Sequence, residues 1–274
     1  MKSKIGIIFL ALFFYLLIPY VAEAGVAIVG ELIHEREATV GESYQGIIFV
    51  RNSSEQSQEI KVYQTDYLFF FDGRSIYGEP GRMKRSNAKW ISFSPKQLTI
   101  PANEVSQVNY TINVPADETL VGTYWSILMI EGISEMLPEA TKSKGDQATL
   151  GIRQVIRYGI QITTHIGDTG VGRLEFLKTR LLREGERRIL QVDIENIGER
   201  LLKSFLWAEL YDEEGSYVGR FEGGEFHIRI YPGTSVRYRV DLSQVPKGAY
   251  RALVVADCGG EDIFGVTYTL ELEE

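Results

Sequence analysis

Apolar and polar residues alternate along most of the chain, in short runs that turn residues separate. The clearest run is Ser235–Asp241, in which Val236, Tyr238 and Val240 alternate with polar residues. A period of two is typical of a strand with one buried face, and no long stretch shows the 3.6-residue period of a helix. The pattern therefore predicts a chain built almost entirely of β-strands.

The predicted strands fall into two series. In the first half they are Gly46–Asn52, Glu59–Tyr67, Val105–Val114, Tyr124–Glu131 and Leu150–Thr164. In the second half they are Val171–Leu182, Arg188–Asn196, Phe205–Tyr211, Tyr217–Phe221, Ser235–Asp241, Tyr250–Ala256 and Phe264–Leu272. We expect an extended loop or hairpin over Phe69–Lys89 and a polar loop over Gly132–Gln147, because both stretches contain glycine and few alternating apolar residues.

The two series repeat the same order of signals. In each, an apolar strand ends in asparagine (Asn52, Asn196), and a Gly-x-Tyr sequence later opens another strand (Tyr124, Tyr250). Gly-x-Tyr at this place is typical of the tyrosine corner of immunoglobulin-like sandwiches, in which the phenol bonds to nearby backbone. The fold class predicted is therefore all-β, with two tandem immunoglobulin-like β-sandwich domains.

A polar, glycine-containing joint separates the two series. It covers Ile166–Gly170 and contains two glycines. Boundaries between domains usually fall in such stretches. We expect a first domain over residues 25–166 and a second over residues 167–274.

Residues 1–24 have the features of a signal peptide. Two lysines precede the apolar run Ile5–Ile18, and Ala22 and Ala24 give the small-x-small pattern of a cleavage site. We expect cleavage after Ala24, a periplasmic or secreted protein, and no membrane span after cleavage. The alternative is that the run remains as an uncleaved anchor, although it is short for a membrane-spanning helix.

The charge and the single cysteine narrow the range of functions. The formal net charge is −8, and removal of residues 1–24 makes it about −9, because two lysines and one glutamate are lost. An acidic chain argues against nucleic acid as the main partner. Cys258 is the only cysteine, so no intrachain disulfide can form. It is expected to be a structural thiol, with dimerisation through it as the alternative.

The sequence contains no recognisable catalytic or metal-binding constellation. His34, His165 and His227 lie far apart, and none has metal-ligand spacing to another histidine or to cysteine. There is neither a Gly-x-Ser-x-Gly motif nor a glycine-rich phosphate loop. We therefore expect no cofactor, no metal and no enzymatic activity, and interpret the chain as a protein-binding one.

The end of the first series carries the most informative pattern. Ala148, Leu150 and Ile152 alternate along one face of a predicted strand, and Arg157 follows. Such an edge can pair its backbone with a partner strand, and a basic residue can anchor a partner's terminal carboxylate. The alternative is an ordinary seventh strand whose apolar face closes its own core.

The first series resembles the periplasmic pilus-assembly chaperones. The resemblance covers roughly residues 25–165 and rests on Arg36 placed 16 residues before Asn52, Ser94-Pro95 before a strand, Tyr124-Trp125 opening the next, and the Ala148, Leu150, Ile152 alternation followed by Arg157. It implies two immunoglobulin-like domains that lend a strand to a pilin-like subunit. It also implies that Arg36 and Arg157 bind the subunit's C-terminal carboxylate in the interdomain cleft; the alternative for each is an exposed, solvated arginine.

Two functions follow as expectations. The first is a chaperone-like exported protein that binds secreted or pilin-like β subunits by edge-strand pairing, with Arg36, Ala148, Leu150, Ile152 and Arg157 as partner-binding residues. The second is a structural or adhesive cell-envelope protein without chaperone activity. Trp90–Pro95, Val114-Pro115 and Gly122–Tyr124 support the second, since they resemble immunoglobulin-like domains of bacterial cell-surface proteins of the WxL type.

Overall fold

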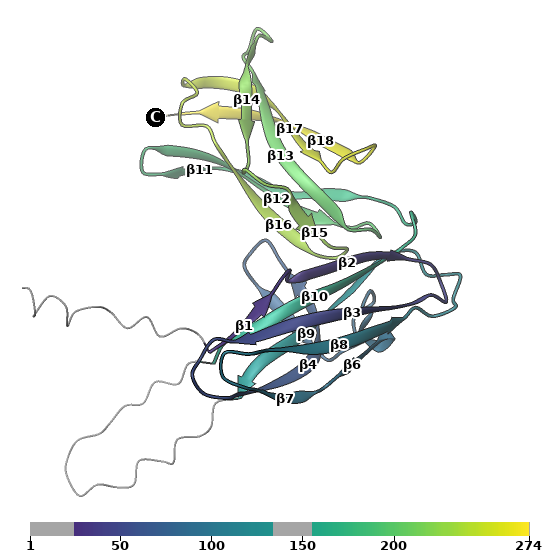
Figure 1. Ribbon diagram of the computed structural model, residues 1–274. Helices are drawn as coiled ribbons and strands as arrows, with labels where there is room; N and C mark the ends of the chain where they lie inside the picture. The colour runs from purple at the N-terminus through teal and green to yellow at the C-terminus, as the bar shows by residue number, and fades with distance from the viewer. Residues whose placement is uncertain (1–24, 134–154, 274) are drawn as a thin grey trace, which may run out of the picture.

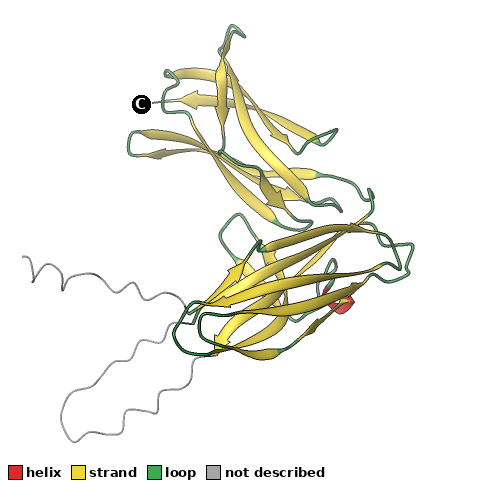
Figure 2. Ribbon diagram, in the orientation of Figure 1, coloured by secondary structure: helices red, strands yellow, loops and turns green. Residues whose placement is uncertain are grey.

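The computed structural model of the protein describes residues 25–133 and 155–273. Within these ranges every element is a strand except η1 (Ala88–Trp90), a single 3₁₀ turn (Figure 2). The strands form four sheets, which make two sandwiches. The prediction of an all-β chain with two tandem immunoglobulin-like sandwiches is confirmed. No helix in the described ranges has the length and apolar character needed to cross a membrane.

The first sandwich packs a four-stranded sheet against a six-stranded one (Figure 1). The four-stranded sheet contains, in spatial order, β1 (Val26–Val29), β3 (Ser43–Asn52), β8 (Val105–Asn113) and β6 (Ile91–Ser94). The other contains β2 (Ile33–Ala38), β10 (Arg157–Ile166), β9 (Gly122–Ile133), β4 (Gln58–Phe69) and β5 (Ser75–Gly78), with β7 (Gln97–Ile100) also on β4.

Alternation along the strands produces the core between these sheets. On β3, Tyr44, Ile48 and Val50 are buried, whereas Ile47 and Phe49 face outward. On β9, Leu128 and Ile130 belong to the same core, as do Ile160 and Ile162 on β10. The side chains at the intervening positions of β9 and β10 therefore lie on the outer face of the six-stranded sheet.

The first two strands of the described chain, β1 and β2, belong to different sheets. β1 pairs antiparallel with β3, and β2 pairs parallel with β10 in the opposite sheet. Between them lies Gly30, whose φ of 107° is in the region that favours glycine, so the chain turns sharply there. β2 covers β10 only from Gln161 to Ile166.

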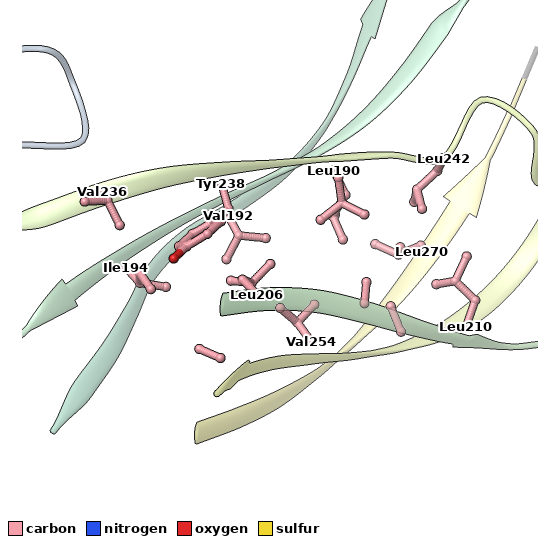
Figure 3. Close-up of a cluster of buried hydrophobic side chains, with 14 of the residues drawn as sticks. Leu190, Val192, Ile194, Leu206, Leu210, Val236, Tyr238, Leu242, Val254 and Leu270 are labelled. Atoms are coloured by element: carbon pink, nitrogen blue, oxygen red, sulfur yellow. The ribbon is translucent and has the colours of Figure 1, made fainter. Parts of the chain in front are cut away.

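The second sandwich has a three-stranded sheet of β11 (Leu174–Glu184), β12 (Arg187–Asn196) and β16 (Ser235–Asp241). Its other sheet contains β14 (Tyr217–Glu222), β13 (Leu202–Tyr211), β17 (Gly248–Asp257) and β18 (Ile263–Leu272), with β15 (Ile228–Ile230) also on β13. Figure 3 shows Leu190, Val192, Leu206 and Val254 meeting between these sheets. β10 ends at Ile166 and β11 begins at Leu174, and the domain boundaries stay a prediction.

The tyrosine corner predicted from the two Gly-x-Tyr sequences forms in the second sandwich. The Tyr250 hydroxyl donates to the backbone oxygen of Pro246, at 3.0 Å. In the first sandwich the Tyr124 ring packs instead against Trp90, with ring centroids 4.7 Å apart, and under the Arg85 guanidinium. The same motif is thus used for two different contacts.

The stretch predicted as a loop or hairpin over Phe69–Lys89 begins as a hairpin, since β5 pairs with β4. The rest is organised by Asp66, which is 1% exposed. Its carboxylate accepts hydrogen bonds from the backbone nitrogens of Gly81, Arg82 and Met83 and from the Ser86 hydroxyl. A buried carboxylate with this many donors fixes the path of the segment.

Candidate functional site

A groove of about 570 Å³ lies on the outer face of the six-stranded sheet. Its floor consists of Ile127 and Met129 on β9 and Gly159 on β10. The tyrosines on one side come from β4 and β5, and the Tyr67 and Tyr77 rings lie 5.0 Å apart. Leu32, Ile33, Tyr63, Thr65, Arg157 and Gln161 complete the lining. A concave, mostly apolar surface with a few polar groups is typical of a binding site.

Beside the groove, the first residues of β10 have a neighbouring strand on one side only, as far as the described residues show. The Gln161 N–H bonds to the Leu32 oxygen on the β2 side, and β2 pairs with no residue of β10 before Gln161 in the described ranges. Backbone groups of alternate residues point to the same side of a strand, so those of Arg157 and Gly159 face away from β9 on this open side. Within residues 25–133 and 155–273, no strand pairs with these groups.

Two cations share one carboxylate at the outer end of the groove. Glu131, which is 8% exposed, bonds to Arg157 at 2.8 Å and to Lys61 at 2.9 Å, and accepts from the Tyr63 hydroxyl at 2.9 Å. Burial alone would raise the pKa of Glu131, but the hydrogen bonds from Lys61 and Tyr63 and the nearby charges outweigh it and lower that pKa. The carboxylate stays ionised, and one positive charge remains in excess.

A second charged cluster lies where the two sandwiches meet. Glu35 on β2 accepts from Lys203 at 2.9 Å, contacts His165 at 3.0 Å and pairs with Arg229 at 3.5 Å. Burial would raise the pKa of Glu35, but the hydrogen bonds from Lys203 and His165 outweigh it and lower that pKa. Because Lys203 and Arg229 belong to β13 and β15, this cluster links the two sandwiches.

An aromatic contact lies next to that cluster. Tyr231, which is 1% exposed, packs against Trp125 with ring centroids 4.8 Å apart and lies 3.0 Å, oxygen to oxygen, from the Thr163 hydroxyl. Burial raises the pKa of Tyr231 to about 12, so its hydroxyl keeps its proton. Trp125 and Thr163 are on the outer face of the six-stranded sheet, so the face that carries the groove also contacts the second sandwich.

The structure does not bring Arg36 and Arg157 together. Arg36 pairs in register with Thr164, at the opposite end of β10 from Arg157. At about 3.3 Å per residue, the two positions are separated by roughly 23 Å along the strand. Their side chains also lie on opposite faces of the sheet. Arg36 is on the inner face, since it lies over the ring of the core residue Tyr44, whereas Arg157 is on the outer face with the groove. One carboxylate therefore cannot bind both guanidinium groups.

The other predicted partner-binding residues, Ala148, Leu150 and Ile152, lie outside the described residues, and their role stays a prediction. Sequence reasoning missed Glu35, Lys203 and Arg229. No local signal could have found them, because they are spread over nearly 200 positions and meet only through the packing of two sandwiches.

The described residues also locate the groups considered for chemistry. They contain no cluster of three or more His, Cys, Asp or Glu side chains placed to hold a metal ion. Cys258 packs against the core of the second sandwich. Burial, together with the carboxylates of Asp262 and Asp257, raises the pKa of its thiol to about 11. The thiol is protonated at neutral pH and thus a poor nucleophile.

Replacing Glu35 with glutamine should lower the free energy of unfolding by about 1 kcal/mol at neutral pH, because a partly exposed ion cluster is lost. The folded pKa of Glu35 lies below its ordinary value of 4.5. Its stabilisation is therefore complete well above pH 4.5 and is lost as the pH falls through the folded pKa. Urea unfolding of wild type and Glu35→Gln across this range checks the difference. Glu55→Gln, at an exposed position, is the control. A difference that grows on acidification contradicts the assignment.

Comparison with known proteins finds similarity in structure only. No protein-family model matches the sequence, and none of the curated proteins matches it. A solved chain from a chaperone–tip adhesin complex of CFA/I fimbriae biogenesis is 14% identical, with 90% of this chain and 98% of that chain covered and a TM-score of 0.48.

Two further solved structures are similar. The class 5 fimbriae chaperone CfaA is 13% identical over 89% of this chain and 98% of its own, with a TM-score of 0.44. A chain from the CsuC–CsuE chaperone–tip adhesion subunit complex of Csu pili of Acinetobacter baumannii is 12% identical over 87% and 97%, with a TM-score of 0.45. At these identities the likeness concerns the fold, and the resemblance to pilus-assembly chaperones noted in the sequence is also found among solved structures.

Proposed function

We propose that this chain is a chaperone-like protein of the periplasm or the cell exterior, which binds a secreted, pilin-like β subunit by pairing with its exposed strand. The observation that carries the proposal is the open edge of β10. Because the first strand changes sheets at Gly30, the backbone groups of Arg157 and Gly159 have no neighbouring strand in the described ranges. Unpaired edge groups beside an apolar groove support strand addition.

Arg157 at the start of β10, and the two residues just before it, support the same proposal. Val155 and Ile156 are 37% and 36% exposed, although both are large and apolar. The Arg157 side chain is 59% exposed while it bonds to Glu131, so part of its guanidinium faces solvent. The apolar side chains give a bound strand a surface to pack against, and the charged side chain can fix the orientation of that strand.

The test is hydrogen exchange on the chain co-expressed in the periplasm with a pilin-like subunit of its own organism. Binding should slow exchange at the amides of Arg157 and Gly159, which face the open side. The amide of Ile160 should change little, because it faces β9. Arg157→Ala should weaken binding roughly tenfold, as expected for an exposed charge-assisted contact. Arg173→Ala, at an exposed residue of the second half, should not. A complex that leaves both edge amides unprotected refutes strand addition at β10.

A further inference from the structure

We propose that the groove selects partner strands carrying an aromatic residue and an acidic residue at alternate positions. The inference rests on the proposed function, because it assumes that a strand pairs with the open edge of β10. It adds the side chains by which this edge would distinguish one strand from another.

The register of an added strand places one of its residues opposite Gly159. The backbone groups of Gly159 face the open side, so in an antiparallel pairing they would exchange hydrogen bonds with that residue. Side chains of directly opposed residues stand on the same face of a sheet. Gly159 belongs to the outer face, together with Gln161 and Thr163. The partner's side chain at this position would therefore enter the groove.

At Gly159, two apolar side chains of the groove approach the place where a side chain of its own would begin. A Cβ atom built on Gly159 would lie 3.1 Å from Cγ2 of Ile127 and 3.4 Å from the sulfur of Met129. Because Gly159 has no side chain, Ile127 and Met129 lie close to its backbone, and an aromatic side chain opposite the glycine would contact both. An aromatic residue opposite a glycine on an edge strand is a recognised stabilising pair, and methionine sulfur interacts favourably with aromatic rings. The Tyr67 and Tyr77 rings give further aromatic surface on the far side of the groove.

Charge complementarity specifies the second position. Arg157 lies two residues before Gly159, so its side chain is on the same face, and an added strand would place a residue opposite it. Arg157 and Lys61 share the single carboxylate of Glu131, which leaves one positive charge in excess. The two cationic side chains are 59% and 47% exposed. A side-chain carboxylate of the partner, two positions from the aromatic residue, would complete this cluster.

The test uses nine-residue peptides with both ends blocked, so that no terminal carboxylate is present. The reference peptide alternates threonine and valine and carries a phenylalanine and a glutamate separated by one residue. In fluorescence anisotropy against the whole protein, replacing the phenylalanine with alanine should weaken binding roughly tenfold. Replacing the glutamate with glutamine should weaken it roughly fivefold.

Two protein variants assign these preferences to the groove. Gly159→Ala should reduce the advantage of phenylalanine over alanine to less than about threefold, because the added methyl group occupies the ring's place. Arg157→Gln should remove the difference between the glutamate and glutamine peptides. Circular dichroism must show that both variants are folded. For a readout that needs no variant, a peptide with benzoylphenylalanine in place of phenylalanine should photo-crosslink to Met129 or Ile127 of the wild-type protein.

The outcomes separate the two proposals. If all peptides bind the wild type equally and the edge amides are protected, the selective groove is refuted and strand addition stands. If the crosslink maps outside the groove, the aromatic position is refuted. If no peptide binds, strand addition at this edge is refuted for threonine- and valine-rich strands of this kind. The proposal of a selective groove is then refuted as well, because it depends on strand addition.

Discussion

Replacing Gly122 with alanine should lower the free energy of unfolding by about 3 kcal/mol, since the substitution combines backbone strain with a steric clash. Gly122 has a φ of 72°, which is strained for any residue with a side chain. The added Cβ would lie 2.1 Å from the backbone oxygen of Glu199, in the second sandwich. That oxygen accepts the Thr123 N–H at 2.9 Å, so the clash breaks a hydrogen bond across the junction.

Urea unfolding measures this loss, and small-angle scattering measures whether the sandwiches separate. Gly132→Ala is the matched control, because Gly132 lies on the same strand with no atom within 4 Å of the added methyl group and no positive φ. The control should stay within about 0.5 kcal/mol of wild type. Equal stabilities of the two variants would show that the junction does not depend on this close approach.

Replacing Asp66 with alanine should lower the free energy of unfolding by about 3 kcal/mol, because a buried acceptor is removed and its donors remain unpaired. One carboxylate oxygen accepts from Gly81 and Ser86, and the other from Arg82 and Met83. Asp66→Asn should lose less, since its amide keeps one acceptor oxygen.

The effect of Asp66 should reach the junction. Arg85, in the segment that Asp66 fixes, donates to the Val121 oxygen at 2.7 Å and pairs with Glu199 at 3.3 Å. Amide exchange should therefore accelerate near both contacts in Asp66→Ala. Asp168→Ala is the control, because that side chain is 97% exposed, and its stability should match wild type. An Asp66→Ala protein as stable as this control would contradict the role of the buried carboxylate.

The larger strands could be predicted from the sequence because their buried faces impose a period of two. β16 is Ser235–Asp241, as the alternation of Val236, Tyr238 and Val240 predicted. Shorter strands escaped prediction. β1 and β5 have four residues each, too few for a period to show. β2 has the sequence Ile-His-Glu-Arg-Glu-Ala, and its exposed residues mask the strand pattern.

The site was harder to predict because it depends on register between distant strands. The sequence supplied Arg36 and Arg157 as basic residues, but the parallel pairing that places Arg36 opposite Thr164 cannot be derived from their spacing. The same pairing brings Glu35 next to His165, a contact that the separation of the histidines gave no reason to expect. Arg157 was selected because it follows a predicted edge strand, and it is the first residue of β10. Its bond to Glu131 requires the β9–β10 ladder.

The junction between the sandwiches relies heavily on main-chain groups. The Thr123 nitrogen donates to the Glu199 oxygen, the Leu201 nitrogen to the Thr123 hydroxyl, and the Phe71 nitrogen to the Ser235 hydroxyl. Every amino acid except proline supplies these nitrogens, whereas two of the three acceptors are the hydroxyls of Thr123 and Ser235. The bend between the two halves should consequently persist in related chains that keep Gly122 and hydroxyl residues at positions 123 and 235, while the surfaces that meet their partners diverge.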